Sequence, residues 1–184
     1  GRIRHTKLNH SGNLLESSFS DQIFDPIGDP LTEKAARVGG TWYFVSFHGK
    51  VVEVDASDEG VSELREWNAL SKKEVKKGWR PGGGQLLAAH DSGTLYLSLN
   101  RKGADSHKLP GERIRAYVIR DQRKIFDIKP AEPVINLAVS SGENPILVAS
   151  TQGPLIFVHS ATDGRYLKQL RGPLLGTGVI QFLK

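Results

Sequence analysis

A pattern of four short strands occurs three times in the chain, and this repeat restricts the fold more than any other feature. Each copy consists of runs rich in β-branched and aromatic residues, separated by turns that contain Gly, Asn, Asp or Pro. The third strands, at residues 51–55, 116–120 and 156–160, resemble one another, with offsets of 64 residues (54 to 118) and 40 residues (118 to 158). Four-stranded repeats of about 40 residues predict the blades of a β-propeller.

The strand signals predict three full blades, at about residues 33–67, 85–128 and 134–170, and partial blades at 1–19 and 178–184. The predicted fold class is therefore all-β, with residues 1–184 as one propeller domain or a fragment of one. A blade cannot bury both faces alone, and a closed propeller needs at least four blades. The end pieces could combine to close a small ring, or the chain could be half of a larger one. We favour the second alternative.

Composition excludes several function classes. No apolar run is long enough to span a bilayer, so we expect no membrane association. The net charge of +5 is spread over basic clusters that acidic residues interrupt, whereas nucleic-acid readers usually carry a denser basic face. We therefore expect no nucleic-acid partner, and a mildly basic surface suits an acidic protein instead. The absence of Cys excludes a disulfide framework or a thiolate metal site within this sequence.

Catalytic motifs are also missing from the sequence. No two histidines stand four residues apart with a carboxylate, which argues against a metal site. No serine lies in a nucleophile-elbow pattern, and the glycines at 82–84 lack the Lys-Ser/Thr of a phosphate loop. We expect no catalytic, cofactor-binding or metal-binding residue in this chain.

The segment 78–85, Gly-Trp-Arg-Pro-Gly-Gly-Gly-Gln, is the most distinctive local sequence. It follows a short helix signal in which Ser71 and Glu74 predict a capping box, and it leads into a strand predicted at 85–90. Proline fixes φ and glycine permits close backbone approach, so this loop has a defined shape. Trp79 either fills the space between blades or forms the wall of a partner or ligand pocket. Arg80 either donates hydrogen bonds between blades or anchors a carboxylate of another chain.

These motifs resemble the heavy chain of the quinoprotein amine dehydrogenases, a group that comprises methylamine and aromatic amine dehydrogenases. The resemblance runs from about residue 24 to the end. It rests on the segment 76–85 after the short helix, Leu-Tyr-Leu at 95–97, His-Lys at 107–108 and the hairpin at 44–50.

The resemblance implies a seven-bladed propeller of about twice this length, with this chain similar to its C-terminal half. It implies that the heavy chain carries no cofactor, and that a small Cys-rich light chain carries tryptophan tryptophylquinone. The expected activity is oxidative deamination of primary amines, with electrons passed to a blue copper protein such as amicyanin or azurin. Two heavy and two light chains would assemble in the periplasm. Candidate light-chain or channel contacts are Trp79, Arg80, Gln85 and His107.

Two departures from the family pattern stand out. The family's heavy chain has a disulfide, which cannot form within this Cys-free sequence, and Gly84 stands where relatives carry an aromatic residue. The channel-gating aromatic of the family belongs to its N-terminal half, so no residue here inherits that role. The main alternative function is a non-catalytic propeller that serves as a protein-binding module. A weaker one is a lactonase-type hydrolase, which needs a central ring of carboxylates around a cation.

Overall fold

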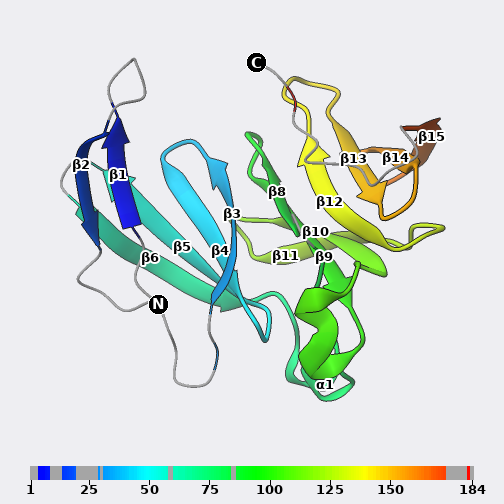
Figure 1. Cartoon of the computed structure of the whole chain (residues 1–184), viewed down its shortest axis with the longest axis horizontal. Helices are drawn as coiled ribbons and strands as arrows, with labels where there is room; N and C mark the ends of the chain where they lie inside the picture. Colours follow the sequence, from blue (N-terminus) through cyan, green and yellow to red (C-terminus); the bar gives the residue numbers. More distant parts are fainter. Residues whose placement is uncertain are drawn as a thin grey trace.

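The computed structural model describes residues 4–8, 14–19, 29, 31–57, 60–83, 86–172 and 182 of the 184-residue chain. These residues form a two-stranded hairpin and three larger antiparallel sheets (Figure 1). The hairpin comprises β1 (Arg4–Leu8) and β2 (Leu14–Phe19). The lone strand predicted at 178–184 lies outside the described residues, apart from position 182.

The three larger sheets follow one another along the chain. The first contains β3 (Leu31–Val38), β4 (Thr41–Ser46), β5 (Lys50–Ser57) and β6 (Gly60–Asn68). The second contains β7 (Arg80–Pro81), β8 (Leu87–His90), β9 (Thr94–Asn100), β10 (Arg113–Val118) and β11 (Arg123–Ile128). The third contains β12 (Val134–Val139), β13 (Ile146–Thr151), β14 (Leu155–Ser160) and β15 (Tyr166–Arg171).

Neighbouring sheets meet along their first long strands. Strand β8 lies between β3 and β12, and the rest of each sheet extends away from this centre (Figure 1). Helix α1 (Lys72–Lys76) follows the first sheet, and the 3-10 helix η1 (Gly103–Lys108) lies between β9 and β10. No helix among the described residues has the length and apolar character to cross a membrane.

Each larger sheet buries apolar side chains against the next one. Strand β10 shows how the alternation of a strand serves both neighbours: Tyr117 packs towards the first sheet, whereas Ile114 and Ala116 pack towards the third. Val45 of the first sheet and Leu147 of the third are completely buried in these two cores. The sheets therefore cover one another's faces, as blades require.

The strand predicted at 85–90 starts later in the structure, at Leu87, so its predicted start was wrong. Two strands, β7 and β8, pair with the same neighbour β9, so the first strand of the second sheet is split. Gly82 N donates to Ser98 O at 3.1 Å, and Ser98 N donates to Leu86 O at 2.8 Å. Ser98 thus bonds to Gly82 and to Leu86, on the two sides of the break between β7 and β8.

Glycine at position 82 follows from tight packing at the end of β7. A Cβ atom there would lie 2.8 Å from Asn100 Cβ and 2.9 Å from the backbone oxygen of Ser106. Gly83 has a φ of +104°, a conformation that other residues rarely adopt. These two glycines therefore allow the chain to pass close to its neighbours as it leaves β7.

Candidate partner interface

Helix α1 begins with the predicted capping box. Glu74 N donates to Ser71 Oγ at 3.3 Å, and Ser71 N donates to Glu74 Oε2 at 2.9 Å. This exchange satisfies backbone donors at the first turn of the short helix. The prediction from Ser71 and Glu74 is confirmed.

A buried arginine of β10 connects this helix to the second sheet. Arg115 is 4% exposed, and its guanidinium lies 2.8 Å from Glu74 Oε1 and 2.6 Å from Asp127 Oδ1. Burial opposes ionisation of Glu74, but hydrogen bonds from Arg115 and Ser71 outweigh it and lower the pKa of Glu74 to about 2. Helix α1 is therefore held on the sheet by a charge-assisted contact rather than by apolar packing alone.

Arg80 is engaged within the chain. Its Nη1 donates to Val75 O at 2.8 Å and to Trp79 O at 2.7 Å, and its guanidinium carbon lies 5.6 Å from the Phe47 ring centroid. These contacts join the end of α1, the following loop and the β4–β5 turn of the first sheet. The two hydrogen bonds are local, and only the contact with Phe47 reaches the first sheet. Hydrogen bonding between blades and contact with a light chain both stay predictions for Arg80.

Trp79 lies both against the core and beside a cavity, and its contact with a partner or ligand stays a prediction. One part of the side chain packs against the core between the first and second sheets. The Arg113 guanidinium carbon lies 4.4 Å from its ring centroid, a cation–π contact. Trp79 also lines a cavity of about 340 Å³ together with Arg101, Lys102, Glu112, Arg113 and Lys129.

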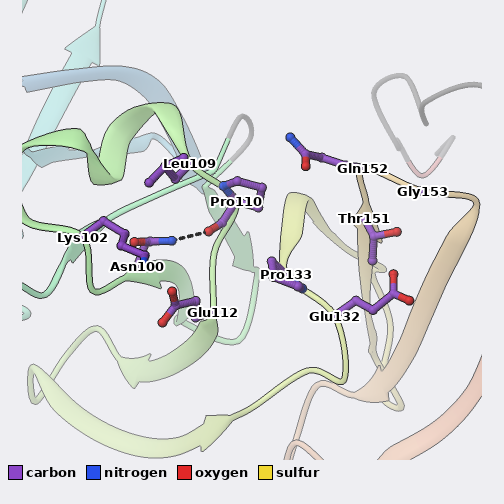
Figure 2. Close-up of a pocket in the computed structure, with 10 residues that line it drawn as sticks. All are labelled: Asn100, Lys102, Leu109, Pro110, Glu112, Glu132, Pro133, Thr151, Gln152 and Gly153. Atoms are coloured by element: carbon purple, nitrogen blue, oxygen red, sulfur yellow. Dashed lines mark hydrogen bonds between the residues drawn. The ribbon is translucent and has the colours of Figure 1, made fainter.

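A second cavity, of about 370 Å³, adjoins the first and shares Lys102 and Glu112 with it. Figure 2 shows how the loops after β9, β11 and β13 build it, and how Asn100 Nδ2 donates to Pro110 O at 2.6 Å. Pro110 and Pro133 form part of its lining, and Thr151 and Gln152 stand on the side of the third sheet (Figure 2). Both cavities therefore lie at the same end of the sheets, beside η1.

The structure says less about His107 and Gln85, the other two candidate contacts. His107 belongs to η1, which contacts β7, but its side chain is outside the described part of the molecule. Gln85 is also outside the described residues.

Sequence reasoning missed Arg113 and Arg115, which it counted among scattered basic residues. The available signal was their spacing with Tyr117, since residues 113, 115 and 117 share one face of a strand.

The residues that the structure describes offer no metal site and no paired tryptophans. They contain no group of three or more His, Cys, Asp or Glu side chains placed to hold a metal ion. The three tryptophans have different neighbours: Arg37 lies over Trp42, Trp67 Nε1 donates to Glu53 at 2.9 Å, and Arg113 lies over Trp79. A quinone built from two linked tryptophans does not fit this arrangement.

Comparison with protein families now identifies the chain. Residues 4–179 match the sequence model of the methylamine dehydrogenase heavy chain (MADH). The chain belongs to the methylamine dehydrogenase heavy chain family. Its similarity to that group, inferred above from the segment 76–85 and its neighbours, is confirmed.

Individual members of the methylamine dehydrogenase heavy chain family are similar to this chain at modest sequence identity. The chain is 27% identical over 132 residues to the heavy chain of Methylophilus methylotrophus, and 26% identical over 141 residues to that of Methylorubrum extorquens. These alignments cover 71% and 76% of this chain but only 32% and 34% of the relatives. The match thus spans about a third of the relatives' length.

Solved structures confirm the fold class. The structures of U3-55K and of the RRP9 WD40 repeats each superpose with a TM-score of 0.58 at 10% identity. Each match covers 87% of this chain and less than half of the other one. WD40 repeats form propeller blades, so this heavy-chain family member is all-β with sheets arranged as in a β-propeller. The extent of the propeller domain and its number of blades stay predictions.

Proposed function

We propose that this chain is part of the heavy, scaffold subunit of an amine dehydrogenase. The observation that carries the proposal is the family match over residues 4–179. The proposed enzyme oxidises a primary amine with water to an aldehyde and ammonia, and releases two electrons and two protons. The chain's own residues hold and orient a partner rather than react.

The redox group is proposed to reside on a separate light chain. Tryptophan tryptophylquinone, when present there, supplies the electron sink for amine oxidation, and a blue copper protein such as amicyanin or azurin takes the electrons. The separate neighbours of Trp42, Trp67 and Trp79 support placing the quinone outside this chain. A periplasmic assembly of two heavy and two light chains completes the proposal.

The light-chain contact is proposed at the end of the sheets that carries Trp79. A half-buried aromatic side chain beside an open cavity is a typical interface anchor, because it offers a large apolar area at low entropic cost. Helix α1 is fixed by Arg115 and the loop is fixed by Arg80, so this surface is formed before a partner arrives.

The test is co-expression of the chain with the light subunit, followed by affinity capture on this chain and an absorption spectrum of the captured complex. We expect a light chain with quinone absorbance to be retained. Trp79→Ala should weaken the capture, and Trp42→Ala, which removes an aromatic from the first sheet, serves as the matched control. A folded chain that captures no light chain would favour the alternative of a non-catalytic binding module.

A further inference from the structure

The end of the molecule that carries Trp79 also gathers positive charge. Four cationic side chains line the cavity beside the tryptophan, and two more lie at the end of helix α1. We call these six the basic face: Lys76, Lys77, Arg101, Lys102, Arg113 and Lys129. Helix α1 joins this face because Gly103 N donates to Gly78 O at 3.0 Å, which places the end of the helix beside residues 101–103.

The charge of this face is largely uncompensated. Lys76, Lys77, Arg101, Lys102 and Lys129 are exposed, and among the described residues no ion pair is formed by their side chains. Two of the nearby carboxylates are already engaged: Glu74 pairs with Arg115, and Asp127 pairs with Arg115, Arg113 and Lys124. Long cationic side chains in this state attract an anionic partner and raise its association rate.

Two carboxylates line the cavities within this face and select the kind of anion. Glu112 and Lys102 line both cavities, and Glu132 lines the second one. A nucleic-acid backbone has no cation to offer Glu112, and one tryptophan does not form the series of stacking platforms that single strands use. A protein segment rich in Asp and Glu can supply one Lys or Arg for Glu112 and carboxylates for the surrounding cations.

From this arrangement we infer that the basic face binds an acidic protein segment. The segment lies along the two adjoining cavities, with carboxylates on Arg101, Lys102 and Lys129 and one basic side chain on Glu112. Its apolar portion covers Trp79 and the two prolines of the second cavity. The inference rests on charge and shape alone, and so it can stand or fall independently of the amine dehydrogenase proposal.

The test uses the full chain and a fluorescently labelled short peptide of Asp and Glu with one central Lys, with anisotropy as the readout. We expect saturable binding that weakens as salt is added. The triple variant R101Q/K102Q/K129Q should bind roughly tenfold more weakly, since each exposed ion pair contributes up to about 1 kcal/mol. The charge-preserving variant R101K/K102R/K129R should restore binding.

The matched control removes three exposed cations elsewhere, on β11 and β15, through R123Q/K168Q/R171Q. This control should leave the affinity within about twofold, because surface charges beyond a Debye length are screened. An equal loss in both triple variants would mean that only net charge matters, and it would overturn the inference. Tighter binding of single-stranded DNA with the same loss in R101Q/K102Q/K129Q would also overturn it.

Glu112→Gln tests the orientation of the segment. It should weaken binding of the Lys-containing peptide and strengthen binding of an all-acidic peptide, because Glu112 attracts the first and repels part of the second. If both peptides change in the same direction, the assigned role of Glu112 is wrong and the segment does not lie along the shared wall of the two cavities.

Discussion

The two junctions between the larger sheets are built on different physical principles. The junction of the first and second sheets contains two buried charged side chains, each paired with less buried partners: Arg115 with Glu74 and Asp127, and Glu53, whose Oε1 lies 2.7 Å from Arg65 Nε. The junction of the second and third sheets is mainly apolar, with Leu147 at its centre.

The connections explain this difference. The second junction is crossed by the short loop between β11 and β12, and backbone bonds between Gly111 and Val134 at 2.6 and 2.8 Å hold it. The first is crossed by a longer segment that contains α1 and the loop with Trp79. A helix without buried residues of its own needs polar contacts to fix it. The proposed light-chain surface therefore lies at the junction whose geometry depends on charge.

The largest expected effect comes from removing the central cation of the first junction. Arg115→Met should destabilise the fold by about 3–5 kcal/mol, because it removes the ion pair of Glu74 and leaves Asp127 with only the more exposed Arg113 and Lys124. Chemical denaturation measures this difference. Lys124→Met removes the exposed partner of Asp127 and should cost less than about 1 kcal/mol. Equal costs for the two variants would contradict the importance of the buried contact.

The apolar junction of the second and third sheets should instead be destabilised by a cavity in its core. Leu147→Ala removes a completely buried side chain and should cost about 2–5 kcal/mol. Leu170→Ala, at a side chain that is 45% exposed, is the control and should stay within about 0.5 kcal/mol. The same denaturation experiment would refute this account of the second junction if Leu147→Ala were also nearly neutral.

The chain at the end of β7 should tolerate no added methyl group. Gly82→Ala should cost about 1–3 kcal/mol, because the new Cβ would overlap Asn100 and the backbone of Ser106. Gly40→Ala is the control, since nothing lies within 4 Å of a Cβ there. Thermal unfolding of both variants measures the difference, and similar midpoints would mean that the packing around Gly82 can relax.

The smallest effect, and the sharpest contrast between the junctions, is in the pH dependence. The pKa of Glu74 falls from 4.5 to about 2 on folding, so its contribution is complete above pH 4.5 and is lost as the pH falls towards 2. The stability difference between the natural chain and Glu74→Gln should shrink over that interval. The cost of Leu147→Ala should stay constant there, and a parallel change in both would remove the contrast.

The repeat allowed much of the fold to be predicted from sequence. Alternating strands and their turns depend on local chemistry, so the predicted strands at 94–99 and 155–160 correspond closely to β9 and β14. The split of the strand before β9 could not be predicted, because Arg80 and Pro81 pair with Asn100 and Leu99 only once the loop has folded. Such pairing is set by tertiary contacts, which local propensity does not contain.

The candidate site was predictable in part. Trp79 stood out as a large aromatic in a loop, and the structure places it beside a cavity. Its partner Arg113 lies 34 positions further along the chain (113 − 79), and only the folded sheet brings the two together. The sequence therefore indicated the aromatic member of the site but not the charges that surround it.

Separation of the subunits of the native amine-oxidising complex, followed by redox staining for quinone and intact mass measurement, tests the central proposal most directly. The scaffold assignment predicts quinone on a small partner chain and none on the chain that contains residues 4–179. Quinone on this chain, or amine oxidation by this chain without a partner, would contradict it.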